Sequence, residues 1–317
     1  MTTPPTAIKA TGLRKAYGDK VVLDGIDLDI PAGTIFSLLG PNGAGKTTTV
    51  EILATLTDAD GGEVHVGGHD IMRNAAGARE AISVTGQFSA VDNLLTGREN
   101  LIMMADLYHL GRTAGRVRAA ELLEQFDLLG AADKSALTYS GGMRRRLDLA
   151  MTLVGRPRII FLDEPTTGLD PRSRRAMWDV IRGLVADGVT VFLTTQYLEE
   201  ADQLADRIAV LDHGRLVAEG TAEDLKRRVP GSYIRLQFAE SRYLEAAAST
   251  LHNVSRDEKS LALKVPTDGS VRSLRTLLDK LDDVAIEVDE LTVHSPDLDD
   301  VFLALTDPSS VQKGSAR

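Results

Sequence analysis

Short runs of predominantly apolar residues recur along the first two thirds of the chain. Each run ends at a glycine or at polar residues, and the runs cover residues 35–39, 158–162, 189–193 and 208–211. Short apolar runs bounded by such signals are typical of strands that are buried on both faces. The pattern therefore predicts an α/β fold built on a parallel β-sheet.

Residues 94–129 have a different pattern. Leucine and methionine positions are separated by charged residues such as Arg98, Glu99 and Glu121 at helical spacing. We therefore expect a helical insertion within the α/β domain, covering about residues 90–150.

Pro230 and Gly231 interrupt the chain, and a new succession of elements follows them. Strands are predicted at residues 234–238, 261–265 and 284–294, and helices at 243–251, 271–281 and 298–305. If residues 253–257 form a further strand, the order is β-α-β-β-α-β, that of a ferredoxin-like plait. The predicted division is a first domain at residues 1–229, a small α+β domain at residues 230–306 and a disordered tail at residues 307–317.

Length and composition limit the classes of protein to which the chain can belong. The length of 317 residues fits two domains of about 150 residues each. The formal net charge of −10 argues against a nucleic-acid partner, since phosphate binding needs clustered basic residues. The sequence has no cysteine, which excludes thiol nucleophiles and thiolate metal sites. Neither a signal peptide nor an apolar run long enough to span a membrane is visible.

A glycine-rich stretch follows the first apolar run. Residues 40–47 read GPNGAGKT and match G-x-x-x-x-G-K-[ST] between a predicted strand and a predicted helix. Glycines let backbone N–H groups converge on an anion, the helix N-terminus adds partial positive charge, and the lysine and threonine can bind phosphate and Mg²⁺. The stretch predicts a nucleoside triphosphate site, against the alternative of a simple strand-to-helix turn. The residues expected to contact the nucleotide are Gly40, Pro41, Asn42, Gly43, Ala44, Gly45, Lys46, Thr47 and Thr48.

Two carboxylates, Asp163 and Glu164, follow the second apolar run. They therefore lie at the carboxyl end of a predicted parallel strand, where ligands bind in such sheets. We expect Asp163 to hold Mg²⁺ together with Thr47, and Glu164 to activate the attacking water as general base. The alternative is a solvated acidic turn before Pro165, and the phosphate-binding motif in the same chain argues against it.

A third motif, Tyr139-Ser140-Gly141-Gly142-Met143, lies between these two sites. With it, the chain resembles the nucleotide-binding subunits of ATP-binding cassette (ABC) transporters over about residues 7–222. In that family two subunits enclose two ATP molecules, and the signature sequence of one faces the phosphate loop of the other. The resemblance therefore implies ATP and Mg²⁺ as ligands and a second copy of the chain as a partner. It also implies that Ser140, Gly141 and Gly142 contact the partner's nucleotide.

Three further positions match motifs of that family. Tyr17 matches the aromatic residue that stacks on adenine, and Gln87 matches the glutamine that contacts Mg²⁺ and the membrane partner. Asp170 lies in the loop that follows the catalytic carboxylate, so the resemblance places it at the nucleotide site. Residues 144–146, three arginines after the signature, are expected to form a solvated helical face.

Two positions depart from the usual pattern of the family. Met143 stands where the signature has glutamine and cannot hydrogen-bond as glutamine would. Gln196 stands at the switch position, where the family usually has histidine. Glutamine can donate a hydrogen bond to the γ-phosphate but cannot take up a proton. We therefore expect Glu164 and Gln196 to be the catalytic residues, with Glu164 as the base.

Residues 194–208, the C-terminal domain and the ending LDDVFLALT at residues 298–306 look like the daunorubicin-resistance type of ATP-binding subunit. This resemblance implies an ATP-driven motor for drug or lipid efflux, bound peripherally to a separate permease at the cytoplasmic face of the membrane. The alternatives are a soluble ABC ATPase that acts on ribosomes or DNA and a nucleotide-gated module with little turnover. A single phosphate loop argues against the first alternative, and Glu164 argues against the second.

Overall fold

The computed structural model describes residues 5–86, 90–228, 231–251, 253–257, 260–268, 270–294 and 296–306. The chain forms two compact units, Met1–Ala222 and Glu223–Arg317. The short helix α8 (Ala222–Arg228) therefore lies almost entirely in the second unit. The domain boundary expected between residues 229 and 230 and the expected tail at 307–317 fall outside the described residues.

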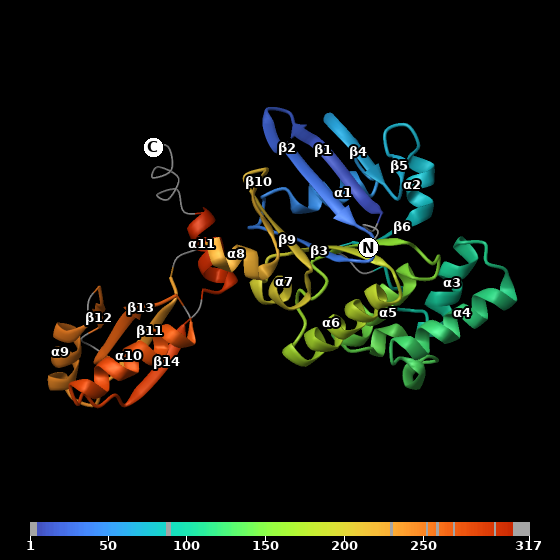
Figure 1. Cartoon of the computed structure of the whole chain (residues 1–317). Coiled ribbons are helices and arrows are strands. Elements are labelled where there is room, and N and C mark those ends of the chain that lie inside the picture. The colour runs from blue at the N-terminus through green and yellow to red at the C-terminus, as the bar shows by residue number, and fades with distance from the viewer. Residues whose placement is uncertain are drawn as a thin grey trace. The chain divides into compact units, whose positions relative to one another are not determined.

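A six-stranded sheet forms the centre of the first unit (Figure 1). Its order is β10-β9-β3-β8-β7-β6, and its strands are parallel except for the edge strand β10, which runs antiparallel to β9. The strands are β3 (Ile35–Leu39), β6 (Ile82–Thr85), β7 (Ile159–Asp163), β8 (Thr190–Thr195), β9 (Arg207–Asp212) and β10 (Arg215–Gly220). The four apolar runs of the sequence correspond to β3, β7, β8 and β9, so the predicted parallel sheet is confirmed.

A second sheet in this unit is antiparallel, with the order β2-β1-β4-β5. Its strands are β1 (Thr6–Tyr17), β2 (Lys20–Pro31), β4 (Gly61–Val66) and β5 (His69–Asp70). The apolar runs did not predict this sheet, because buried and exposed positions are mixed along its strands. A half-buried strand leaves no continuous apolar run in the sequence.

The two faces of the central sheet pack into separate cores. Ile160, Leu162 and Val191 belong to a core shared with the helices between residues 97 and 204. Phe161 and Phe192 alternate with them and belong to a core shared with the antiparallel sheet. The period of two along a strand produces this division, because neighbouring side chains point to opposite faces.

Helices cover the central sheet and form the expected insertion. They are α1 (Lys46–Leu53), α2 (Ala75–Ala81), α3 (Gly97–Leu107), α4 (Arg112–Gln125), α5 (Gly141–Thr152), α6 (Pro171–Ala186) and α7 (Leu198–Leu204), with 3₁₀ turns η1 (Leu129–Ala131) and η2 (Ala136–Thr138). The insertion begins at a capping box, in which Thr96 and Glu99 exchange hydrogen bonds at the start of α3.

The second unit has the β-α-β-β-α-β order of a ferredoxin-like plait, as predicted. Its antiparallel sheet has the order β12-β13-β11-β14. The elements are β11 (Tyr233–Gln237), α9 (Ser241–Thr250), β12 (Ser255–Asp257), β13 (Ala262–Pro266), α10 (Val271–Asp283), β14 (Glu290–His294) and α11 (Leu298–Thr306). The strand expected over residues 284–294 begins only at Glu290, so the first half of that prediction was wrong. Ile286 packs into the core ahead of the strand, which accounts for the apolar pattern there.

Candidate active site

The glycine-rich loop joins β3 to α1 in the predicted strand–loop–helix arrangement. Gly43 and Gly45 have φ angles of 82° and 112°, in the left-handed region that favours glycine. A Cβ on Gly40 would collide with the carbonyl oxygen of Leu211, so the loop can lie this close to β9 only with glycine there. Gly45 is the N-cap of α1 and has no side chain with which to cap it. The helix therefore presents its first N–H groups to another acceptor.

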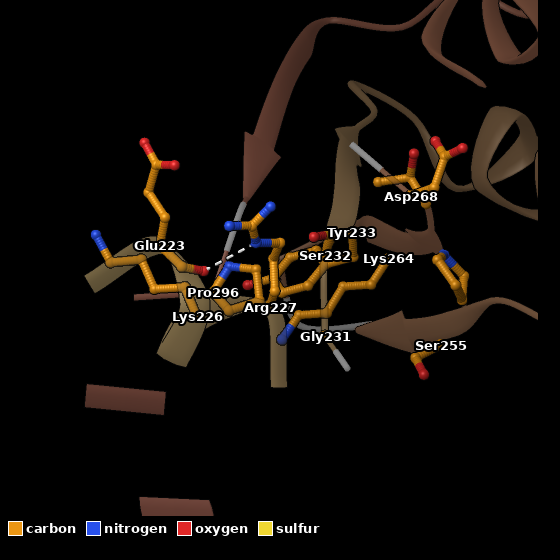
Figure 2. Close-up of a pocket in the computed structure, with 12 residues that line it drawn as sticks. Glu223, Lys226, Arg227, Gly231, Ser232, Tyr233, Ser255, Lys264, Asp268 and Pro296 are labelled. Atoms are coloured by element: carbon orange, nitrogen blue, oxygen red, sulfur yellow. Dashed lines mark hydrogen bonds between the residues drawn. The ribbon is translucent and has the colours of Figure 1, made fainter. Parts of the chain in front are cut away.

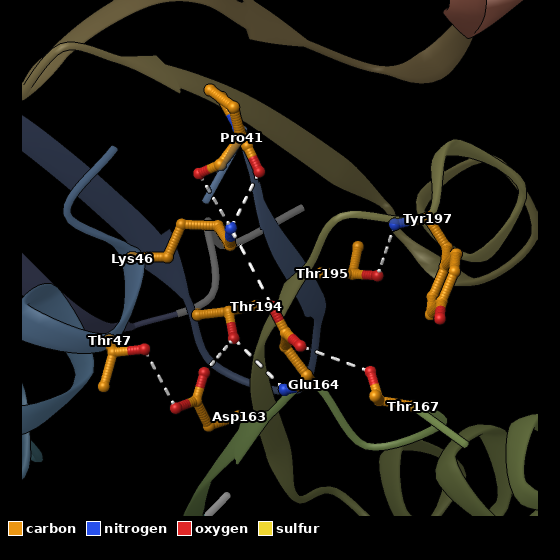
Figure 3. A network of polar contacts seen from close by, with 10 residues as sticks. Pro41, Lys46, Thr47, Asp163, Glu164, Thr167, Thr194, Thr195 and Tyr197 are labelled. Carbon is orange, nitrogen blue, oxygen red and sulfur yellow. Dashed lines mark hydrogen bonds and ion pairs between the residues drawn. The ribbon is translucent and has the colours of Figure 1, made fainter. Parts of the chain in front are cut away.

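The ammonium group of Lys46 is held inside this loop (Figure 3). Its Nζ donates hydrogen bonds to the carbonyl oxygens of Gly40 at 2.7 Å and Pro41 at 3.1 Å, and lies 3.9 Å from Oε1 of Glu164. Burial lowers the pKa of Lys46, while the carboxylates of Glu164 and Asp163 act in the opposite direction. A cation in this position can bind phosphate groups that lie along the loop.

Asp163, at the end of β7, joins the loop to the neighbouring strand. Its Oδ2 accepts a hydrogen bond from the Thr47 hydroxyl at 3.1 Å, and its Oδ1 accepts one from the Thr194 hydroxyl. The parallel register pairs Asp163 of β7 with Thr194 of β8, so the strand ends bring these groups together. The Asp163 carboxylate is buried.

Glu164 has an uncommon backbone conformation, with a φ of 47° in the left-handed region. Its N–H donates to the carbonyl oxygen of Thr194 at 3.1 Å and to the Thr194 hydroxyl at 3.2 Å. Its Oε2 accepts a hydrogen bond from the Thr167 hydroxyl at 3.2 Å. Backbone strain of this kind persists where the surroundings enforce it, and it is concentrated at active sites. Glu164 therefore holds its carboxylate beside Lys46 (Figure 3).

A pocket of about 540 Å³ brings the main predicted residues together. It is lined by Lys20, Val22, Asn42, Gly43, Gly45, Lys46, Thr47, Thr48, Glu164, Thr167 and Gln196. The expected base and the switch position thus border the same space as the phosphate loop. Lys20 and Val22 were missed, because they come from β2 and no local motif marks them. Thr167 was also missed, although its position three residues after Glu164 was a usable signal.

The other predicted site residues lie outside this pocket or outside the described residues. Tyr17 is half exposed and has Lys15 Nζ 5.2 Å from its ring centroid. Ser140 is the N-cap of α5, where its Oγ accepts the N–H of Met143 at 3.2 Å. Asp170 is the N-cap of α6, and hydrogen bonds from Ser173 lower the pKa of its carboxyl group. Gln87 lies among the residues that the structure does not describe.

The donor set at the loop suits Mg²⁺. The Thr47 hydroxyl and the Asp163 carboxylate lie 3.1 Å apart, and oxygen atoms are the ligands that this ion prefers. Mg²⁺ is usually bound by one or two carboxylates together with substrate phosphates. Over the described ranges, no group of three or more His, Asp or Glu residues could hold a metal ion alone. The site is therefore suited to an ion that arrives with a nucleotide.

A larger pocket, of about 890 Å³, lies in the second unit (Figure 2). Several of its charged side chains are engaged with neighbouring groups of that unit. Lys264 Nζ lies 4.8 Å from the Tyr233 ring centroid, and Arg227 pairs with Asp224 at 2.8 Å. Hydrogen bonds from Ser273 and Ser270 lower the pKa of Asp268 to about 2. The predicted site residues that the structure describes all lie in the first unit, so we place the chemistry there.

Comparison with known proteins identifies the family of the chain. The family model of ABC transporters matches residues 23–167. The daunorubicin resistance ATP-binding protein DrrA3 of Streptomyces coeruleorubidus is 49% identical over 303 residues, which cover 95% of this chain and 96% of that protein. The daunorubicin/doxorubicin resistance protein DrrA of Streptomyces peucetius is 48% identical over 96% of this chain and 94% of its own length. The linearmycin resistance protein LnrL of Bacillus subtilis is 35% identical over 94% of this chain and 98% of its own length.

A solved structure of an ATP-binding subunit of an ABC transporter matches the fold with a TM-score of 0.62 and 26% identity. The matched region covers 70% of this chain and 92% of the solved chain. The fold and the pocket define a P-loop nucleoside triphosphatase of the ATP-binding cassette class. The chain belongs to the ATP-binding subunits of ABC transporters, and within them to the daunorubicin-resistance type. Among the described residues, no helix has the length and apolar character needed to cross a bilayer.

Proposed function

We propose that this ATPase is the motor of a bacterial exporter that moves a drug or lipid through a separate transmembrane permease. The observation that carries the proposal is the single pocket at which the phosphate loop, Glu164 and Gln196 meet. The names of the relatives, which refer to daunorubicin, doxorubicin and linearmycin resistance, support a drug as the exported compound.

The phosphate loop binds the nucleotide. The phosphates of ATP lie along the N–H groups at the start of α1. Lys46 gives up its hydrogen bonds to the loop carbonyl groups and binds the β- and γ-phosphates instead. Thr47 and Asp163 would hold Mg²⁺, with Gln87 as a further ligand, and the ion would supply positive charge against the phosphates. Tyr17 stacks on adenine, and half of its side chain is exposed in the structure.

Hydrolysis uses Glu164 as the general base. Its carboxylate takes a proton from the water that attacks the γ-phosphate, and the bond between the γ-phosphorus and the bridging oxygen to the β-phosphate breaks. ADP and inorganic phosphate are the products. Gln196 donates an amide N–H to the γ-phosphate, a role that requires no proton transfer by this residue.

A second copy of the chain completes the site. The N-terminus of α5, with Ser140, Gly141 and Gly142, is exposed or half-buried and lies outside the pocket of its own chain. It can therefore supply N–H groups to the γ-phosphate bound by the partner, with Asp170 near the same interface. ATP holds the dimer closed, and hydrolysis releases it. The permease transmits this cycle across the membrane, so the chain works at the cytoplasmic face.

The substitution Glu164→Gln tests the proposal. We expect it to keep ATP affinity, reduce turnover by about a factor of 10² to 10⁴, which is the usual contribution of a general base, and trap an ATP-bound dimer. Hydrolysis is measured by phosphate release and dimerisation by size-exclusion chromatography with ATP and Mg²⁺. Unchanged turnover would show that Glu164 is not the base. Stimulation of the ATPase by a drug, in vesicles that also contain the permease, tests the export step.

A further inference from the structure

The backbone of Glu164 needs an explanation, because its φ of 47° is costly for a residue with a side chain. Because this region is unfavourable for any residue other than glycine, neighbouring groups must enforce the conformation. Thr194 fixes the N–H of Glu164 from one side. This contact leaves the two carbonyl groups that flank Glu164, those of Asp163 and Pro165, to be held by other groups.

Arg145, on α5, binds both of these carbonyl groups. Its Nη2 donates to the carbonyl oxygen of Asp163 at 3.3 Å, and its Nε donates to that of Pro165 at 2.9 Å. One planar guanidinium group therefore spans Glu164, because it holds the peptide unit directly before Glu164 and the one that follows Pro165. The Arg145 side chain is only 15% exposed, so the prediction of a solvated face was wrong for this residue.

Other groups fix the position of Arg145 itself. Its Nη1 pairs with the Asp148 carboxylate at 3.1 Å and donates to the carbonyl oxygen of Gly86 at 3.4 Å. Asp148 is buried and also accepts the N–H of Ala90 at 2.9 Å. Gly86 and Ala90 border the residues that include Gln87. The guanidinium group is thus preorganised by Asp148 of its own helix and by the segment that contains Gly86.

We propose that Arg145 is a positioning residue for hydrolysis, which holds Glu164 in the left-handed conformation that directs its carboxylate to the phosphate loop. The inference rests on the proposed role of Glu164 as the base. Arg145 lies about one helical turn after Gly141, on the helix whose N-terminus carries the signature sequence. A displacement of that helix therefore changes the position of the base in the same chain.

The first test compares Arg145→Gln with Arg118→Gln. Arg118 is a matched control, since its side chain is 18% exposed, pairs with Glu121 three residues later and donates to the Leu153 carbonyl, away from Glu164. We expect Arg145→Gln to lower kcat by about 10- to 100-fold, because a misplaced catalytic group costs this much, while the Kd for a fluorescent ATP analogue changes less than about threefold. Arg118→Gln should leave both kcat and the Kd for the analogue within about threefold of the wild-type values. An equal loss of kcat in both variants, or a loss confined to ATP affinity, would overturn the proposal.

The second test asks whether Arg145 acts through Glu164. In single-turnover hydrolysis, Arg145→Gln should add no further loss to Glu164→Gln, because the base is already absent. A multiplicative loss in the double variant would mean that Arg145 acts independently and would refute the assignment. Arg145→Lys should recover part of kcat, since lysine can reach one carbonyl but cannot span both. The Glu164→Gln variant alone reports on the proposed base, so the failure of either idea can be distinguished.

Discussion

The indole N–H of Trp178 donates a hydrogen bond to the buried carboxylate of Glu200 at 3.2 Å. This contact joins α6 to α7, the helix that follows Gln196. Arg174 adds to it, since its guanidinium carbon lies 5.0 Å from the Tyr197 ring centroid and its Nη1 lies 3.5 Å from Glu199. The segment that follows the switch position is therefore held against α6.

Burial raises the pKa of Glu200 above its ordinary value of 4.5. The native state then keeps a proton that the unfolded chain loses, so Glu200 lowers the stability as pH rises from about 4.5 through the native pKa. Glu200→Gln removes this dependence. We expect the difference in free energy of unfolding, variant minus wild type, to increase from pH 5 to pH 8. Urea unfolding can be followed by the fluorescence of Trp178, the only tryptophan in the sequence. Parallel stability curves for the two proteins would contradict this prediction.

Lys46→Ala should weaken ATP binding by about 10- to 100-fold, since a hydrogen bond to a charged group contributes about 1.5–3 kcal/mol. Titration with a fluorescent ATP analogue measures the effect. Lys264→Ala is the matched control, because Lys264 lies in the second unit, 4.8 Å from the Tyr233 ring centroid, and does not line the pocket at the phosphate loop. Equal affinities for wild type and Lys46→Ala would refute the assignment of the phosphate loop.

The local parts of this site could be predicted from the sequence, because each lies within a few residues of its own motif. The phosphate loop needs only a strand, glycines and a helix start, and Asp163 and Glu164 need only the end of β7. Arg145 could not be interpreted in this way. Apart from Asp148, its partners are backbone carbonyl groups 18 or more residues away in sequence, and a carbonyl group carries no signal of residue type.

Gln196→Ala should lower kcat by about 10- to 100-fold if its amide donates to the γ-phosphate, with little change in ATP affinity. Gln196→His should retain more activity and introduce a titration near pH 6.5, which glutamine cannot produce. The pH profile of phosphate release for the three proteins is the measurement. Full activity of the alanine variant would remove Gln196 from the mechanism.

Asp170→Ala should lower the stability of the first unit by about 1 kcal/mol, because it removes the N-cap of α6. The carboxylate accepts the N–H groups of Arg172 and Ser173, both at 3.0 Å. Ser270 caps α10 in the second unit, so Ser270→Ala should shift the Trp178 unfolding transition less. A loss of hydrolysis much greater than the loss of stability would indicate that Asp170 also acts at the nucleotide of the partner. A Trp178 transition shifted equally by both variants would contradict the assignment of the cap.

The central sheet divides the hydrophobic interior of the first unit, with Leu162 facing one side and Phe161 the other. A substitution in the core between the sheet and the helices can be accommodated by repacking of that core, without moving the side chains around the phosphate loop. Substitutions in the helices α3 and α4 can therefore accumulate while the residues around the phosphate loop stay the same. Arg145 is an exception to this freedom, since it extends from the variable side to the backbone of the base. A chimaera that exchanges the helical insertion should thus keep Arg145 and Asp148 together with the β7 segment that they contact.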